Sequence, residues 1–252
     1  PAGNPATSHL LDAGIFSHKT PYASFRSGYE GNFTFDRRLQ QKKGLERRVD
    51  RYEIYVNSGS FTINFLDYVD IFGILGTGKI ESDFRVVKEE ELNKGDIPAC
   101  HRIVTRSTDE FSWAMGGNIS LVTWNEVAVG MGGRYTTFEP KLAYFAIDVD
   151  TFSPGNSSFS YQEWQLQLAV SYCIDFLIPY IGIKYSKAYS RTTLPLAGII
   201  DTQKIAERNF KSKGEAGLYL GCTTTAKNAF LLNIEARVID EEAVSVLAEF
   251  RF

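Results

Sequence analysis

Three histidines are the side chains of this sequence best suited to acid–base or nucleophilic chemistry. His9 and His18 precede the first predicted strand, and His101 follows Cys100 in a long polar segment. Adjacent residues of an extended segment point to opposite sides, so Cys100 and His101 are poorly placed to form a reactive thiol–imidazole pair. None of the three imidazoles is expected on an inward strand face. The histidines therefore disfavour an enzyme such as an outer-membrane hydrolase.

Two acidic residues, Glu81 and Asp83, have the spacing along one strand face that a glycosidase-like acid and base could use. They alternate with Lys79 and Arg85, which makes a ladder of charges along a pore the simpler interpretation. The preceding stretch 73–79 contains glycines and a lysine, but it lacks the spacing of a phosphate-binding loop and no helix follows it. We therefore expect no catalytic residues here.

The composition excludes further classes of function. A net charge of −3 argues against nucleic acid as a partner, because phosphate binding needs a concentrated basic surface. The three cysteines, Cys100, Cys173 and Cys222, lack the spacing of metal ligands, although one disulfide remains possible. No apolar run approaches the roughly 18 residues of a membrane-spanning helix. We expect no metal and no cofactor. The opening Pro1-Ala2-Gly3 is typical of a mature chain after leader cleavage.

Alternation of apolar and polar residues is the dominant pattern, and it predicts strands with one face of each kind. From Phe25 to Asp36 the odd positions are mostly aromatic and the even positions are polar or charged. Similar alternation recurs at 71–86, 161–173, 180–189, 230–238 and 244–252, and less regularly at 49–66, 110–122, 126–138 and 209–223. Aromatics form 13% of the chain, yet the mean hydropathy is slightly negative, which suits a barrel that is apolar outside and polar inside.

These segments predict an all-β fold, a transmembrane antiparallel up-and-down β-barrel of about ten strands, with twelve as the alternative. The barrel occupies residues 22–252, and residues 1–21 form an N-terminal segment that is periplasmic or associated with the lumen. Short links alternate with long ones, which predicts short periplasmic turns and long extracellular loops. Two aromatic girdles are expected, one at the short-turn rim (Phe25, Phe65, Phe72, Trp124, Tyr172, Phe230, Phe250 and Phe252) and one at the opposite rim (Phe35, Tyr52, Phe84, Trp113, Tyr135, Trp164, Tyr189 and Phe210).

The polar faces of these strands define the predicted pore lining. It consists of Arg26, Glu30, Lys79, Glu81, Asp83, Arg85, Arg134, Glu163, Lys184, Lys211, Glu235, Arg237, Glu249 and Arg251. So many charges would be costly in a dry interior, which favours a wet lumen, and their mixed signs predict no strong ion selectivity. The assignment places Arg85 in the ion path. The apolar segment 142–147, with Tyr144 and Phe145, is a candidate constriction loop; a surface loop packed on its neighbours or at a subunit interface is the alternative.

Several stretches resemble the chlamydial major outer membrane porins. They are Gly3-Asn4-Pro5-Ala6, 28–37 (GYEGNFTFDR), 163–165 (EWQ), 168–172 (LAVSY), 179–186 (PYIGIKYS), 234–241 (IEARVIDE) and 248–252 (AEFRF), and they occur in order along the chain. The resemblance implies an integral, trimeric outer-membrane porin, whose Phe250 and Phe252 form the signal that the barrel-assembly machinery reads. This chain departs from the family in being shorter and poorer in cysteine, which puts a wide pore and an envelope cross-linking role in doubt.

The combined expectation is a passive pore in the bacterial outer membrane for ions and small hydrophilic solutes, surrounded by outer-membrane lipid. A barrel of about ten strands lies between the filled and the open sizes, so permeation is expected to be restricted. A closed structural or adhesive barrel, whose loops bind a partner, is the alternative. A soluble ligand-binding barrel would need an apolar interior and a polar exterior, which the terminal strands disfavour.

Overall fold

The computed structural model describes residues 4–5, 23–41, 49–87, 100–155, 157–194, 206–226 and 229–252. Within these ranges the chain forms antiparallel strands: β1 (Ala23–Arg37), β2 (Leu39–Gln41), β3 (Val49–Phe65), β4 (Val69–Val87), β5 (Cys100–Ser107), β6 (Glu110–Trp124), β7 (Val127–Phe138), β8 (Leu142–Ile147), β9 (Asp150–Phe152), β10 (Phe159–Tyr172), β11 (Leu177–Leu194), β12 (Ala206–Ser212), β13 (Ala216–Ala226), β14 (Phe230–Val238) and β15 (Glu241–Arg251). No helix in these ranges is long and apolar enough to cross a membrane.

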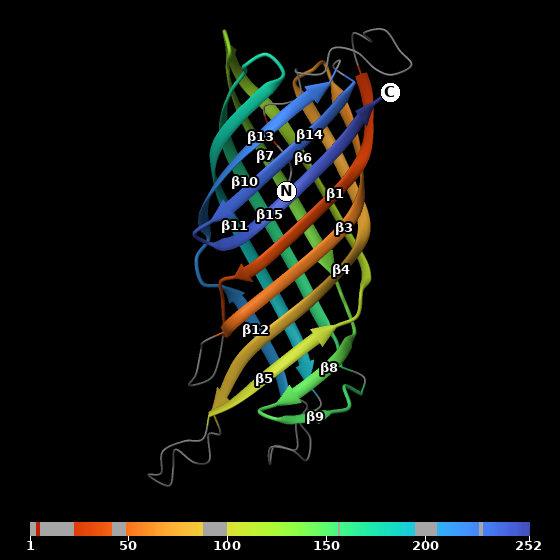
Figure 1. Cartoon of the computed structure of the whole chain (residues 1–252), viewed down its shortest axis with the longest axis vertical. Coiled ribbons are helices and arrows are strands. Elements are labelled where there is room, and N and C mark those ends of the chain that lie inside the picture. The colour runs from red at the N-terminus through yellow and green to blue at the C-terminus, as the bar shows by residue number, and fades with distance from the viewer. Residues whose placement is uncertain are drawn as a thin grey trace.

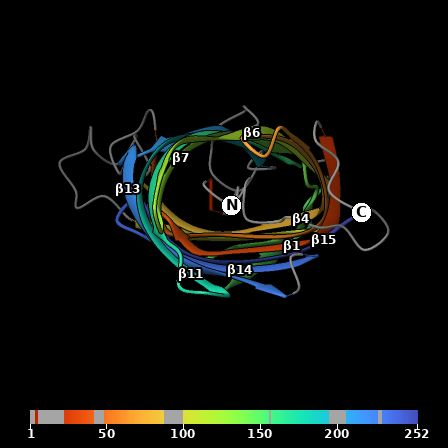
Figure 2. The same cartoon turned by 90° about the horizontal axis from the view of Figure 1, so that it is seen from above.

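Ten of the described strands close a ring. The order is β1–β3–β4–β6–β7–β10–β11–β13–β14–β15, and β15 pairs with β1 to complete it. Figure 1 shows the strands tilted around one axis, and Figure 2 shows the closed ring from above. The predicted antiparallel up-and-down barrel of about ten strands is confirmed. Closure removes every unpaired strand edge from the ring, as a barrel in lipid requires.

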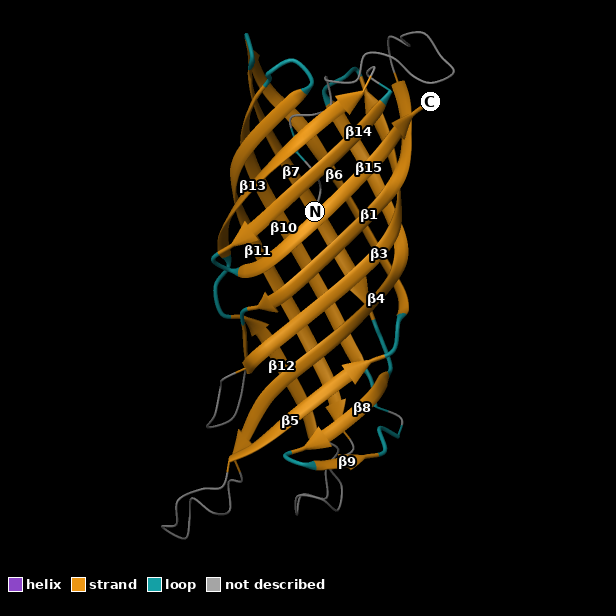
Figure 3. Cartoon of the chain, in the orientation of Figure 1, coloured by secondary structure: helices purple, strands orange, loops and turns teal. Residues whose placement is uncertain are grey.

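A second tier of strands extends the wall at the long-loop end. There β4 leaves β6 and pairs instead with β5, which in turn pairs with β8. On the other side β12 pairs with the last residues of β11 and with β2. Figures 1 and 3 show β5, β8, β9 and β12 at the end opposite the C-terminus. The long links are therefore partly strands, and the barrel is taller than the ten-strand pattern alone predicted.

Near the short-turn end, the outer face is apolar. Tyr29, Ile71, Leu166 and Ile181 point outward and are 48%, 56%, 52% and 62% exposed, as lipid-facing residues should be. On β1 and β10 the inward neighbours of these residues, such as Glu30 and Gln167, are polar, whereas on β4 the inward Phe72 and Ile74 are apolar. The inside-out distribution predicted for β1, β10, β11, β14 and β15 is therefore confirmed.

Near the long-loop end, the polarity is reversed, and β4 shows the reversal within one strand. Its outward face begins with Ile71 and Leu75 and ends with Lys79 and Arg85, whereas its inward face ends with Phe84, which is 0% exposed. Where water replaces lipid outside, apolar side chains are stabilised inside, as in a soluble protein. The predicted faces of 71–86 are therefore wrong: Phe72, Ile74, Ile80 and Phe84 point inward, and Lys79, Glu81, Asp83 and Arg85 point outward.

The inward apolar side chains form one packed group, here called the distal core. It contains Leu39, Tyr52, Ile54, Val56, Ile80, Phe84, Ile103, Phe138, Leu142, Phe145, Ile147, Phe159, Tyr161, Ala188, Leu194 and Phe210. The ring of Phe210 lies 5.3 Å from that of Phe84 and 6.2 Å from that of Tyr52, whose hydroxyl is 2.6 Å from Ser190 Oγ. Four residues assigned to the girdles, Tyr52, Phe72, Phe84 and Phe210, are therefore interior.

The segment predicted as a constriction loop is part of the wall. Residues 142–147 form β8, which pairs with β5 and β9. Phe145 is fully buried in the distal core, whereas Tyr144 points outward and is 37% exposed. The wall takes up this segment as a strand whose pairing with β5 contains a register shift, and its Leu142, Phe145 and Ile147 belong to the distal core.

Candidate functional site

The lumen between the distal core and the short-turn rim is lined by charged side chains. Nine of the predicted pore-lining residues point into it and are at most 8% exposed: Arg26, Glu30, Arg134, Glu163, Lys184, Glu235, Arg237, Glu249 and Arg251. The outward Lys79, Glu81, Asp83 and Arg85 do not, and Lys211 is exposed on the outer face of β12, beside the inward Phe210. The inward position predicted for Lys211 is therefore wrong, because at this height the apolar Phe210 takes the inward side and the lysine faces out.

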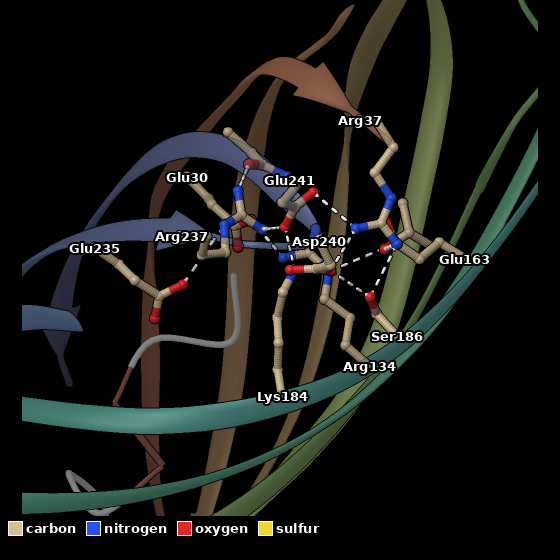
Figure 4. Close-up of polar contacts among 12 residues, drawn as sticks. Glu30, Arg37, Arg134, Glu163, Lys184, Ser186, Glu235, Arg237, Asp240 and Glu241 are labelled. Carbon is tan, nitrogen blue, oxygen red and sulfur yellow. Dashed lines mark hydrogen bonds and ion pairs between the residues drawn. The ribbon is translucent and has the colours of Figure 1, made fainter. Parts of the chain in front are cut away.

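The centre of the lumen holds a network of buried ion pairs, here called the central cluster: Arg37, Glu163, Lys184, Arg237, Asp240 and Glu241 (Figure 4). The Arg37 guanidinium lies 2.7 Å from Glu163, 2.7 Å from Asp240 and 3.2 Å from Glu241. In the ion pairs that Asp240 and Glu241 form with Arg37 and Lys184, every side chain is at most 2% exposed. Each charge of the central cluster thus has a close partner of opposite sign, which buried ions require.

Lys184 and Arg237 complete the central cluster. Lys184 Nζ lies 2.9 Å from Asp240 Oδ2 and also binds Glu241, and Arg237 lies 3.2 Å from Glu241 and 3.8 Å from Glu235. Two carboxylates from one hairpin are therefore shared among three cations from β1, β11 and β14. The cluster ties three remote strands together across the lumen.

The two central carboxylates come from the turn between β14 and β15. Ile239 in this turn has a φ of 85°, a conformation that costs a β-branched residue free energy. The turn aims Asp240 inward, where Ser186 donates a 2.8 Å hydrogen bond to it. Gly217 leaves the space for this carboxylate, because a Cβ at Gly217 would lie 1.9 Å from Asp240 Oδ1. The strained turn thus directs Asp240 inward, and Gly217 leaves room for its carboxylate.

Replacing Gly217 with alanine is expected to displace Asp240 and lower the free energy of unfolding by about 1–3 kcal/mol, as overpacking does. Urea unfolding in lipid vesicles measures the loss. Gly73→Ala is the matched control, because a Cβ at Gly73 meets no heavy atom within 4 Å. Equal stability of the two variants would show that Asp240 does not depend on the space at Gly217.

A second group of charges lies nearer the short-turn rim. Arg26 binds Asp70 at 2.6 Å and Glu249 at 3.3 Å, and Ser60 and Thr62 each donate a 3.0 Å hydrogen bond to Glu249. Asn4, which is 1% exposed, lines the cavity beside this group. The volume of this cavity is about 20 Å³. A second lumen cavity, between Asn32 and Gln165, measures about 10 Å³. Each of these two cavities has room for about one water.

Further polar side chains fill the remaining space. Arg134 lies 2.5 Å from Glu30, and the Tyr180 hydroxyl lies 3.0 Å from both Asn233 and Glu235. Small side chains of β6 and β7 also point inward, among them Ser112, Ala114, Asn118, Ala128 and Gly132.

The predicted pore lining lacks Arg37, Asp70, Asp240 and Glu241, which the structure places inside. The inward positions of β1 are even up to Thr34, but a register shift between Thr34 and Asp36 makes Arg37 inward as well. No local signal marks that bulge. Asp240 lies in the tight turn between β14 and β15, and no local pattern indicates that a turn residue points into the lumen.

The groups considered for chemistry lie apart from the lumen. His101 Nδ1 is 2.7 Å from Asp148 Oδ2 at the long-loop end, whereas His9 and His18 lie outside the described residues. Cys173 and Cys222 are free thiols, and no side-chain statement applies to Cys100. Among the residues that the structure describes, no three His, Cys, Asp or Glu side chains are grouped to hold a metal ion.

Comparison with known proteins identifies similar chains. The family model of the Chlamydia major outer membrane protein matches residues 146–194. The major outer membrane porin, serovar E, of Chlamydia trachomatis is 24% identical over 370 alignment positions, covering 100% of this chain and 94% of the porin. The major outer membrane porin of Chlamydia muridarum is 21% identical, again with 100% and 94% coverage. The predicted resemblance is therefore confirmed along the chain, and the length of the alignment confirms that this chain is the shorter one.

Solved structures of similar topology include the outer membrane protease OmpT of Escherichia coli, with a TM-score of 0.46, 8% identity, and 92% and 98% of the two chains covered. An outer membrane channel from Pseudomonas putida F1 has a TM-score of 0.45, 10% identity, and 96% and 100% coverage.

Proposed function

We propose that this chain, which matches chlamydial major outer membrane porins along its whole length, is itself an integral outer-membrane porin for ions and small hydrophilic solutes. The observation that carries the proposal is the inside-out barrel, with apolar residues against lipid and ionised residues around the lumen. Relatives named porins align with all of this barrel. Transport of this kind involves no bond making or breaking, and we propose no enzymatic activity.

The described conformation is a closed one. The distal core fills the long-loop half, and the central cluster crosses the middle of the lumen. Once the ion pairs of the lumen separate, their cations and anions line a hydrated path that carries both signs of charge. Solute passage therefore requires the distal core and the central cluster to move, and permeation is restricted to ions and very small molecules.

Planar-bilayer recording of the purified barrel tests the function directly. Discrete ohmic current steps of small conductance are expected, with weak ion selectivity because the lumen charges are mixed. Arg85→Glu is expected to leave the reversal potential unchanged, since Arg85 lies on the outer face. A correctly folded barrel that gives no steps at any voltage would contradict the porin proposal.

A closed structural or adhesive barrel is the second candidate, and the distal core favours it. An apolar interior makes the long-loop half a rigid platform, as expected for a surface that presents loops to a partner. The recording separates the two candidates, because a permanently closed barrel carries no current.

Assembly and oligomeric state extend the proposal. Phe250 and Phe252 point outward at the C-terminus, 45% and 41% exposed, which supports their role as a signal for the barrel-assembly machinery. The buried Asn4 supports a lumen-associated N-terminal segment over residues 1–21. A trimer is proposed from the resemblance alone, and chemical cross-linking in the native membrane tests it by the size of the largest product.

A further inference from the structure

We propose that the outer face of β3, β4 and β5 binds the phosphate of an anionic lipid headgroup in the outer leaflet of the membrane. The face is here called the cationic face and consists of Arg51, Lys79, Arg85, Arg102 and Arg106. It lies outside the lumen and takes no part in the proposed solute path.

The height of the cationic face on the barrel matches the headgroup layer. On β4, Ile71 and Leu75 occupy the lipid-facing positions, and Lys79 follows four residues after Leu75 on the same outward face. On β3, Phe61 and Ile63 occupy the apolar part and Arg51 the far end. Side chains directly beyond the apolar band of a membrane barrel meet headgroups, so cations there face anionic groups of the lipid.

Tyrosines lie between the apolar, lipid-facing part of the wall and the cationic face. Tyr55 lies between the apolar part of β3 and Arg51, and Lys79 Nζ is 4.8 Å from its ring centroid. On the neighbouring strands, Arg106 is 5.7 Å from the ring of the outward Tyr144. Tyrosine is enriched at membrane–water interfaces, which places the arginines one step further into the headgroups.

The charges of the cationic face form two layers, with the carboxylates underneath. Arg102, which is 61% exposed, lies over Asp83, which is 16% exposed. Arg106 lies over Glu81 with exposures of 62% and 28%, and Arg51 over Glu53 with exposures of 64% and 7%. Pairing reduces the attraction for an anion, but the cations are nearer the surface, so an approaching phosphate meets positive charge first.

The guanidinium orientation favours a second anionic partner. Arg51, Arg85 and Arg106 each pair with a carboxylate through Nε, so their terminal nitrogens are not the atoms in closest contact with it. Phosphate and carboxylate are both matched by the planar fork of arginine. The carboxylate layer thus holds the forks in position for a ligand above them.

A groove between the strands provides the space. Its volume is about 360 Å³, and its lining combines Arg51, Arg102 and Arg106 with the inner carboxylates and the small or apolar Ser82, Val104 and Thr105. This groove is large enough for a phosphate with part of a sugar or glycerol attached. The continuity with the apolar band selects a membrane lipid over a free anion, because the acyl chains of a bound lipid would lie along Ile71 and Leu75.

The test measures binding of a fluorescent monophosphorylated glycolipid to the folded barrel in neutral detergent micelles, by anisotropy. Replacing Arg51, Arg102 and Arg106 together by glutamine is expected to weaken binding about a hundredfold, at about fivefold per cation near a headgroup. The matched control replaces Lys187, Arg191 and Lys211, three outward cations of β11 and β12, and is expected to change binding less than twofold. Equal losses in both triple variants would overturn a localised site.

Two further arms keep the result interpretable. Asp83→Asn removes a carboxylate from under Arg102 and is expected to tighten binding severalfold, an effect opposite in sign to any general loss of fold. The dephosphorylated lipid is expected to bind weakly to every variant. Competition by millimolar inorganic phosphate would show a free-anion site and overturn the lipid assignment. Conductance of the same preparation reports on the porin proposal separately.

Discussion

Arg37→Met is expected to lower the free energy of unfolding of the barrel by about 3–5 kcal/mol, the cost of breaking a buried ion network on one side. The Arg37 guanidinium is fully buried and binds Glu163, Asp240 and Glu241, and it donates a 2.9 Å hydrogen bond to Ser186. Methionine fills a similar volume but leaves these carboxylates without their shared cation. Urea unfolding in lipid vesicles, followed by the mobility of unheated protein in detergent gels, measures the change.

The neighbouring residue provides the control for this prediction. Arg38 is 48% exposed and lies 3.8 Å from Glu242, so Arg38→Met is expected to cost no more than about 0.5 kcal/mol. The double variant Arg37→Met/Glu163→Gln should recover part of the lost stability, since it removes one uncompensated charge. If Arg37→Met and Arg38→Met were equally stable, the central cluster would not stabilise the barrel.

Phe210→Ala is the second large effect, and it is expected to cost about 3–5 kcal/mol in the free energy of unfolding. The Phe210 ring is 1% exposed and packs against Phe84 and Tyr52 in the middle of the distal core. The truncation leaves a cavity in a group that closes the lumen. The same urea unfolding measures the loss of stability.

A second result of Phe210→Ala concerns conduction. Because the distal core blocks the long-loop half, loosening it should increase the frequency of open events in planar bilayers. Phe111→Ala is the control, as Phe111 is 61% exposed on the outer face of β6 and should not alter the current. An unchanged open frequency in Phe210→Ala, with the expected loss of stability, would locate the closing element elsewhere in the lumen.

For the strands that cross lipid along most of their length, the sequence predicted both the residue range and which side chains face outward. On β10, Leu166, Leu168 and Val170 alternate with polar residues, and they are 52%, 39% and 47% exposed on the outer face. The outer solvent there is lipid, so apolar residues must be outside. The candidate lumen residues of these strands, such as Glu163 and Lys184, followed from the same rule.

Strands that leave the membrane were not predictable in this way. On β4 the outward positions change from the apolar Ile71 and Leu75 to the charged Lys79 and Arg85, because the solvent outside changes from lipid to water. The inward side of β4 carries apolar residues both before and after this change, from Phe72 to Phe84. Alternation specifies that two faces differ and leaves open which face is inside. A bulge in β1 places Arg37 in the lumen, and a strained turn before β15 places Asp240 there. Both features depend on contacts between strands far apart in the chain.

By itself, the amino-acid sequence determined the class of fold, the strand segments and the inside-out character near the short-turn rim, since these follow from local alternation and composition. The resemblance to porins rested separately on the stretches that match the family in chain order. The tertiary structure alone decided the height at which the membrane ends, and with it the distal core and the cationic face. It also decided which charges meet in the central cluster. These depend on which solvent surrounds each level of the closed ring and on pairing between residues far apart in the chain, and neither is a property of a local segment.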